Sequence, residues 1–477
     1  MIKKRIFYAL ILSVFLLLGF IYLNKVFASS HRYANTIEDF DELTKKENID
    51  IIFYGSSHSF TCYNPLIINN ITKTTSYNLG SDALLMSLTD LVLEQSLKKT
   101  KPKLIILEVY KGTITAPSDT KEAKGYQLRA LDLVSNFSFK KYTEVERIYN
   151  KNEYLGVLFP LIRNHTDWNS KNFSSFSKRV NFDPNDFYYG GYVGYGTIIG
   201  EKDNRSKYEN FRNQEKRKNN KDTLLNNKIK EDIAAFLKIA NEQNIPVLAV
   251  TSPDLRAIYE NYYLYDEFRI FFDKFNVPYL NLNDYYDELD LSVNDFRDPG
   301  HLNRTGGTKA SKFLANYLNE HYKFDDRSSE STWQSINKKY LDFKNTYEER
   351  IYQKQLQANL IESIKVKDIE LTNSGQIYSI KITIDGTKNY KDDYGKYSLS
   401  LKIFPYDNNE LSDYSKSKNW NFDKEDIKLK DEDSILTFQL KSKIKEIKQI
   451  EMFLYNTEEY KGVIGEKLII NNLDLLE

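Results

Sequence analysis

Three side chains that together support serine-based acyl transfer occur at two distant places in this chain of 477 residues. Ser57 ends a Gly-Ser-Ser turn that directly follows the apolar, β-branched run Ile51–Tyr54. Far downstream, Asp298 and His301 lie three residues apart in a polar stretch. A serine nucleophile, an imidazole base and a carboxylate that orients the imidazole are the minimum set for forming an acyl-enzyme. We therefore expect these three side chains to converge in space.

A parallel α/β sheet would bring such residues to one edge, because ligands bind outside the carboxyl ends of the strands in open sheets of this kind. Segments with helical spacing separate the apolar runs, and a closing helix is expected at Thr308–Tyr322. Strands that alternate with helices predict a three-layer α/β fold. The predicted strands are Ile51–Tyr54, Leu104–Leu107, Val247–Val250 and Tyr279–Leu282.

Composition and patterning divide the chain further. Residues from about 112 to 225 lack strand–helix alternation and are rich in Asn, Lys, Ser and aromatic residues, so we expect an inserted cap over the site. The last part alternates with period two, which is typical of a β-sandwich. The predicted parts are an anchor at 1–24, a polar stalk at 25–48, the α/β domain at 49–325, a helical connector at 326–358 and the β-sandwich at 359–477.

The N-terminus indicates export. Lys3, Lys4 and Arg5 precede the uncharged apolar run Ile6–Leu23, and about 18 such residues suffice to cross a bilayer. Because basic residues stay on the cytoplasmic side, we expect a single pass through the cell membrane with an extracellular C-terminal body. A cleaved signal peptide, with a site near Val26–Ala28, is the alternative.

Charge and cysteine content exclude other classes. Lys+Arg and Asp+Glu both number 67, so the chain lacks the cationic excess expected of a protein that binds nucleic acid. The single cysteine, Cys62, allows no internal disulfide. His58, His165 and His301 offer no short ligand spacing, and we expect neither a metal nor another cofactor.

The motifs resemble those of the SGNH/GDSL hydrolase family. The resemblance rests on the Gly-Ser-Ser turn after a strand, on Gly80 after the next strand and on Asp298-x-x-His301 before the last helix. It implies a three-layer α/β fold with Ser57 as nucleophile, His301 as base and Asp298 as the orienting carboxylate. It also implies that the backbone N–H groups of Ser57 and Gly80 form two parts of the oxyanion hole.

The resemblance covers about half of the chain, Ile51–Tyr110 and Val247–Tyr322. One feature departs from the family pattern. The third oxyanion donor of the family is usually an asparagine just after the Leu104–Leu107 strand, and here Glu108 to Lys111 contain none. Tyr110 is a possible substitute. Otherwise two donors remain, which would leave the protein a slow enzyme or an inactive one.

A membrane-anchored form with Gly-Ser-Ser is similar to the DltD-type proteins of teichoic-acid D-alanylation and to accessory acyltransferases of extracellular polysaccharide O-acetylation. That similarity implies a serine acyltransferase that acts on hydroxyls of a cell-surface polysaccharide or teichoic-acid-like polymer. A multi-spanning membrane acyltransferase would be its partner and would bring the acyl group across the membrane. Two alternatives remain: an esterase or deacetylase of surface glycans, and a non-catalytic glycan-binding or assembly protein on the same fold.

Alternatives also remain for single residues. Ser57 would be an ordinary turn serine if the fold kept it from His301, and Ser56 is the rival nucleophile. Four further residues, some near Ser57 and some in the insertion, carry side chains suited to contacts with a glycan. These candidate substrate-binding residues are His58, Tyr110, His165 and Trp168.

Overall fold

The computed structural model divides into two compact units, Met1–Tyr340 and Leu341–Glu477, which are described separately. In the first unit the structure describes residues 2–112, 121–132, 134, 138–168, 178–213, 225, 227–258 and 262–340. In the second unit it describes 341–347, 350–361, 364–374, 377–385, 397–407, 410–411, 418–422, 434–441, 447–456 and 463–471.

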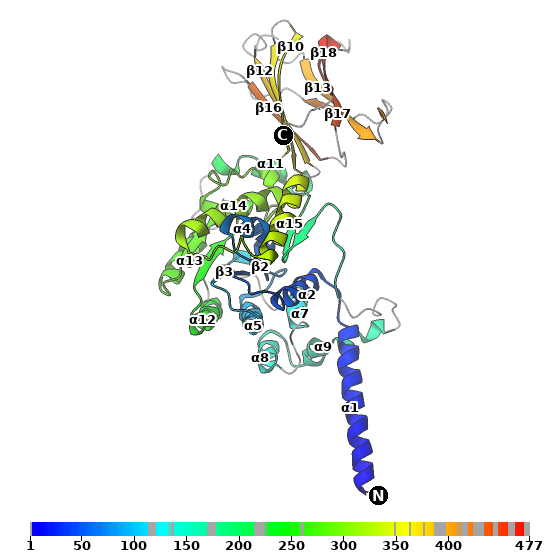
Figure 1. Ribbon diagram of the computed structural model, residues 1–477, viewed down its shortest axis with the longest axis vertical. Coiled ribbons are helices and arrows are strands. Elements are labelled where there is room, and N and C mark those ends of the chain that lie inside the picture. The colour runs from blue at the N-terminus through cyan, green and yellow to red at the C-terminus, as the bar shows by residue number, and fades with distance from the viewer. Residues whose placement is uncertain are drawn as a thin grey trace. The chain divides into compact units, whose positions relative to one another are not determined.

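A parallel five-stranded sheet with the order β2-β1-β3-β6-β7 forms the centre of the first unit (Figure 1). The strands are β1 (Ile51–Tyr54), β2 (Ser76–Asn78), β3 (Leu104–Glu108), β6 (Val247–Thr251) and β7 (Tyr279–Asn281). The four predicted strands are confirmed, and β2 is the short strand that precedes Gly80. Because the chain order reverses between β1 and β3, a crevice is expected at their carboxyl ends.

Helices cover both faces of this sheet. Successive side chains of β1 belong to different hydrophobic cores. Ile52 and Tyr54 pack with one set of helices, and Ile51 and Phe53 pack with the other. The first set is α5 (Met86–Leu97), α12 (Asn227–Glu242) and α13 (Tyr263–Asp273), and the second is α4 (Pro65–Thr72) and α14 (Arg304–His321). Strands buried on both faces are typical of parallel sheets, and the predicted three-layer α/β fold is confirmed.

The N-terminal helix α1 (Ile2–Val26; Figure 1) is long and apolar enough to cross a membrane. Its apolar side chains are largely exposed. A membrane anchor and a signal sequence both fit this helix. The stretch that follows is not the expected polar stalk. Helix α2 (Arg32–Thr44) buries Tyr33, Thr36 and Phe40, and two of these join the core beside α5. The folded domain therefore begins near residue 32, because the apolar stripe of α2 has a core to cover.

The predicted insertion contains short helices and a hairpin. Its residues 113–120, 133, 135–137, 169–177, 214–224 and 226 lie outside the described part of the chain. The described elements are α7 (Lys121–Leu131), α8 (Phe139–Ile148), α9 (Tyr154–Leu158), α10 (Pro160–Arg163), the antiparallel pair β4 (Phe187–Tyr189) and β5 (Tyr192–Gly194), and α11 (Arg205–Tyr208).

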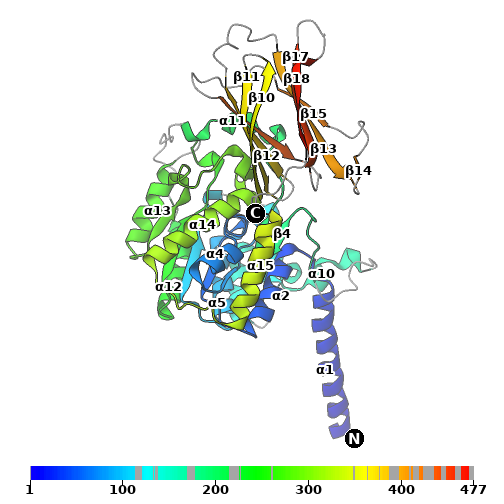
Figure 2. The same ribbon diagram turned by 45° about the horizontal axis from the view of Figure 1, so that its top comes forward.

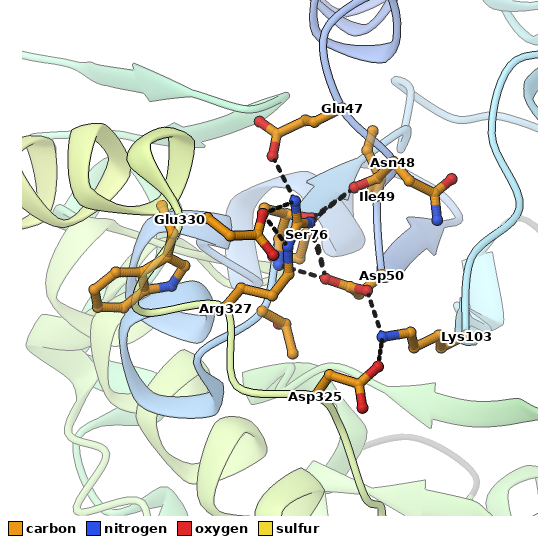
Figure 3. Close-up of polar contacts among 12 residues, drawn as sticks. Glu47, Asn48, Ile49, Asp50, Ser76, Lys103, Asp325, Arg327 and Glu330 are labelled. Carbon is orange, nitrogen blue, oxygen red and sulfur yellow. Dashed lines mark hydrogen bonds and ion pairs between the residues drawn. The ribbon is translucent and has the colours of Figure 1, made fainter.

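After α14, the side chain of Arg327 bonds to residues just before β1 and so connects this part of the chain to the amino end of that strand (Figure 3). Its guanidinium donates to the Asn48 carbonyl at 2.9 Å and to Asp50 Oδ2 and Glu47 Oε2, both at 3.2 Å. Lys103 approaches the other oxygen of Asp50 at 3.1 Å. Helix α15 (Ser331–Tyr347) follows, so the predicted connector is helical in part.

The second unit consists of two antiparallel sheets, as expected for the predicted β-sandwich (Figure 2). It begins at Arg350 instead of at residue 359, because the end of the predicted connector is already a strand. One sheet contains β10 (Arg350–Ile361), β11 (Ile364–Ser374), β12 (Ile377–Asp385) and β16 (Ser434–Lys441). The other contains β13 (Tyr397–Asp407), β14 (Glu410–Leu411), β15 (Lys418–Phe422), β17 (Ile447–Asn456) and β18 (Val463–Asn471).

Candidate active site

The structure brings Ser57, His301 and Asp298 together at the carboxyl edge of the parallel sheet. Ser57 is the first residue of α3 (Ser57–Cys62), which follows β1. Its Oγ lies 2.8 Å from Nε2 of His301, across 244 residues of sequence. Nδ1 of His301 lies 2.8 Å and 3.0 Å from the two carboxylate oxygens of Asp298. The predicted convergence of these side chains is confirmed.

The Asp298 carboxylate fixes the protonation pattern of the imidazole. Burial raises its pKa, but the hydrogen bond and charge of His301, the N–H of Gly300 and the nearby Arg297 outweigh burial, so the pKa lies below its ordinary value. An ionised carboxylate only accepts hydrogen bonds. Nδ1 of His301 therefore donates to Asp298, and Nε2 is left to accept from the hydroxyl of Ser57.

The turn before the nucleophile is sharp and depends on Gly55. Its φ of +143° lies in a region that L side chains rarely adopt, and a Cβ there would lie 2.6 Å from Oε2 of Glu108. Ser56, the rival nucleophile, has its hydroxyl engaged within the turn. The Oγ donates to Glu108 at 2.9 Å and accepts from the N–H of His58 at 3.2 Å. Its position indicates a helix cap.

Glu108, at the end of β3, stands where the resemblance led us to expect an asparagine. Its buried Oε2 accepts from the Ser56 N–H and from the Ser56 hydroxyl, both at 2.9 Å. Burial raises the pKa of Glu108 to about 7, although the two hydrogen bonds from Ser56 act in the opposite direction. From the sequence we noted only the missing donor. An acid directly after a buried strand was the available signal for a residue that supports the turn.

Gly80 lies against the same turn, as the resemblance implied. A Cβ on Gly80 would lie 2.9 Å from the Ser56 carbonyl oxygen and 3.0 Å from Cβ of Ser59. Its N–H donates to Oδ1 of Asn78 at 3.0 Å, and the Asn78 amide also donates to the Ser59 carbonyl at 3.0 Å. The oxyanion role of Ser57 and Gly80 therefore stays a prediction. Asn78, which the sequence did not single out, holds the Gly80 loop to α3.

Of the four candidate substrate-binding residues, His58 lies beside His301, and Tyr110 lies against His58. The ring of His58 is 2% exposed and stacks on Tyr110 at 3.5 Å and on His301 at 4.5 Å. Burial holds the pKa of His58 well below its ordinary value, so the ring is neutral at pH 7. Arg256, which the sequence did not single out, donates to the Tyr110 hydroxyl at 2.5 Å and pairs with Asp254 at 2.8 Å.

His165 and Trp168 lie elsewhere. Both side chains are exposed, with Nδ1 of His165 2.9 Å from the Ile162 carbonyl and Nε1 of Trp168 donating to the Leu161 carbonyl at 2.9 Å. Among the described residues, none of their contacts reaches Ser57, Asp298 or His301. The sequence pattern predicted one insertion and did not reveal that its parts pack against different regions of the domain.

A different part of the insertion borders the site. The Asn78 N–H donates to the Gly190 carbonyl at 2.8 Å, so the β4–β5 hairpin is attached to the end of β2. The guanidinium of Arg297, next to Asp298, lies 3.8 Å above the ring of Tyr195, which follows the hairpin. Within the described chain, the part of the predicted cap that lies at the site is therefore the region around this hairpin. No cluster of His, Cys, Asp or Glu able to hold a metal occurs in that described part.

Fold and site together define an α/β protein with a Ser-His-Asp arrangement at the carboxyl edge of a parallel sheet. No family model matches the chain, and no curated protein matches it. Among solved structures, an acetyl xylan esterase is similar with 11% identity and a TM-score of 0.28, over 57% of this chain and 98% of the esterase. A two-domain esterase active on acetylated mannans is similar with 10% identity and a TM-score of 0.24, over 93% of this chain and 95% of the other. Likeness at these values transfers no activity to this chain.

Proposed function

We propose that this chain is a serine-dependent acyl-transfer enzyme. Ser57 is the nucleophile, His301 is the general base and Asp298 orients the imidazole. The observation that carries the proposal is the continuous pair of hydrogen bonds, 2.8 Å from Ser57 Oγ to His301 Nε2 and 2.8 Å from His301 Nδ1 to Asp298 Oδ1. Nucleophile, base and orienting group are thus within hydrogen-bonding distance of one another.

The first half-reaction forms an acyl-enzyme. Ser57 Oγ attacks the carbonyl carbon of an acyl donor while its proton passes to Nε2 of His301. The imidazolium is stabilised by the ionised Asp298, and it then gives the proton to the departing group as the old bond breaks. The neutral ring of His58, stacked 4.5 Å from that of His301, adds no second positive charge beside the imidazolium.

The second half-reaction transfers the acyl group. An acceptor hydroxyl loses its proton to His301 and attacks the acyl carbon, and the released Ser57 oxygen regains a proton from the imidazolium. The backbone N–H groups of Ser57 and Gly80 would stabilise the oxyanion, with Gly80 shared between the oxyanion and Asn78. Loss of one such donor typically costs about 10²–10³-fold in rate, so a hole without the asparagine is expected to give slow turnover.

The acceptor we propose is a hydroxyl of a cell-surface polysaccharide or teichoic-acid-like polymer, with a multi-spanning membrane acyltransferase as donor-side partner. The apolar helix α1 supports an exported body tethered to the membrane, which suits an immobile acceptor. An esterase of surface glycans uses the same three residues with water as acceptor. Ser57→Ala separates the two in whole cells: we expect it to lower the acyl content of a surface polymer, while purified wild-type protein cleaves small esters slowly. Rapid Ser57-dependent cleavage of small esters, with unchanged polymer acylation, would favour the esterase.

A non-catalytic role has one specific observation in its favour. The Gly80 N–H, one of the two expected oxyanion donors, is already directed at Oδ1 of Asn78 at 3.0 Å. A binding protein of this kind would leave both polymer acylation and ester cleavage unchanged when Ser57 is replaced by Ala. Loss of polymer binding on replacing site residues, without any change in chemistry, would then identify it.

A further inference from the structure

The end of helix α1 is docked on one part of the insertion, residues 154–168. Oδ1 of Asn24 accepts from the Leu161 N–H at 3.2 Å, and Nδ2 of Asn164 donates to the Phe27 carbonyl at 2.6 Å. The rings of Phe20 and Phe159 meet edge to face at 5.1 Å. Figure 2 shows α10 beside this end of α1. The segment is thus held where the apolar helix ends.

The same segment exposes large apolar side chains, and two of its polar side chains donate to carbonyl groups of the segment itself. Leu155 is 61% exposed, Trp168 is 54% exposed and Ile162 is 39% exposed. The indole N–H of Trp168 donates to the Leu161 carbonyl, and Arg163 donates to the Gly156 carbonyl at 3.1 Å. Outside α1, most exposed large apolar side chains in the described chain lie between Tyr126 and Trp168. Large exposed apolar patches on a protein surface usually mark a site that contacts another protein, a ligand or a membrane.

We propose that residues 154–168 lie in the interface of the lipid bilayer, with Leu155, Ile162 and Trp168 in contact with lipid. The lipid surface is favoured as the partner because the exposed side chains belong to the segment that is docked on the end of the exposed apolar helix α1. Tryptophan is also the residue type enriched at membrane–water interfaces. The proposal rests on the proposed anchoring by α1 and adds a second contact with the membrane, which α1 alone does not provide.

This second contact fixes the orientation of the catalytic domain. Arg32 lies five residues beyond Phe27, a span of at most about 18 Å. Its guanidinium donates to the Gly80 carbonyl at 3.1 Å and lies 3.6 Å above the ring of Phe60 in α3, the helix that begins with Ser57. A chain held at two points on the bilayer would keep the nucleophile near the membrane surface, where it would meet membrane-bound donors and acceptors.

Single-cysteine labelling of the full-length protein in lipid nanodiscs tests this proposal. Cys62 is buried and burial raises the pKa of its thiol, so the native cysteine contributes little background. Nitroxides are placed by L155C and I162C, with I270C as the matched control, because Ile270 is 60% exposed on α13. Power saturation then compares access of oxygen, which enters lipid, with access of a water-soluble nickel chelate. We expect greater oxygen than nickel access at 155 and 162, and the reverse at 270.

Nickel access at 155 and 162 equal to that at 270 would overturn the proposal, because a segment that contacts the lipid of the nanodisc is shielded from a water-soluble chelate. The exposed side chains of residues 154–168 would then contact another protein in the cell, or only water. Failure of the chain to stay with the nanodiscs would overturn it as well, together with anchoring by α1. The readout requires no turnover, so a lipid-contacting segment in a protein whose Ser57 is unreactive would overturn the proposed chemistry and leave this inference standing.

Discussion

The carboxylate of Glu108 holds Ser56, the residue directly before the nucleophile. Its Oε2 accepts both the backbone N–H and the hydroxyl of Ser56 at 2.9 Å, from the end of the neighbouring parallel strand. The other carboxylate oxygen has no hydrogen-bond partner among the described residues. The buried Glu108 carboxylate, in addition to the local turn, therefore holds the N-cap of α3 and with it the position of Ser57.

Glu108→Gln should change how stability depends on pH. Burial raises the Glu108 pKa from 4.5 to about 7 in the folded protein, so its contribution to stability is full below 4.5 and is lost as pH rises through 7. The difference corresponds to about 3 kcal/mol at most. We expect the free energy of unfolding of wild type, measured by denaturant titration, to fall relative to that of the variant between these pH values.

Glu144 also has a pKa raised to about 7 by burial, so the informative quantity is the difference between wild type and variant at each pH. Glutamine keeps an acceptor for the Ser56 N–H and has no charge to lose. Parallel pH profiles for the two proteins would contradict a buried, titrating Glu108.

Gly55→Ala should destabilise the protein and disturb the site. The backbone at +143° would strain alanine, and its Cβ would collide with the Glu108 carboxylate. Strain of this kind costs about 1–3 kcal/mol, which thermal or denaturant unfolding can measure. Gly125→Ala in α7 is the matched control, since a Cβ there meets no atom within 4 Å. Equal stability of the two variants would argue against the turn geometry described above.

Arg327→Ala should lower stability without touching the site. The guanidinium pairs with Glu47 and Asp50, whose side chains are 6% and 4% exposed, at the amino end of β1 (Figure 3). Removing one partner of a buried ion pair typically costs about 3–5 kcal/mol. Arg179→Ala, which breaks a half-exposed pair with Asp39, should cost less than about 1 kcal/mol. A similar cost for both variants would show that the Arg327 network contributes little.

The elements that could be predicted from the sequence are those with a clear local pattern of apolar residues. The strands at Ile51–Tyr54 and Leu104–Leu107 are uninterrupted apolar runs, and such runs predict buried parallel strands. The proximity of Ser57 and His301 followed from the expectation that both lie at the carboxyl edge of one parallel sheet. Their catalytic roles stay predictions, as do those of Gly80 and Asp298.

Other features depend on contacts that no local pattern carries. The charges of residues 25–48 suggested a stalk, yet Tyr33, Thr36 and Phe40 are spaced for one face of a helix, and that face is buried. The role of Glu108 arises from a neighbouring strand, 52 residues away from Ser56. The sequence predicts one cap over residues 112–225, but the β4–β5 hairpin lies at the site while residues 154–168 lie at the end of α1.

The most direct test of the central claim is covalent labelling by a fluorophosphonate probe, followed by mass spectrometry of the labelled peptide. We predict that wild-type protein is labelled on Ser57, that Ser57→Ala is not labelled, and that a folded Ser56→Ala variant keeps the label because its hydroxyl serves Glu108 and the helix cap. Circular dichroism of each variant shows that it is folded. Absence of label from folded wild-type protein, or undiminished labelling of Ser57→Ala, would contradict the assignment of Ser57 as the nucleophile.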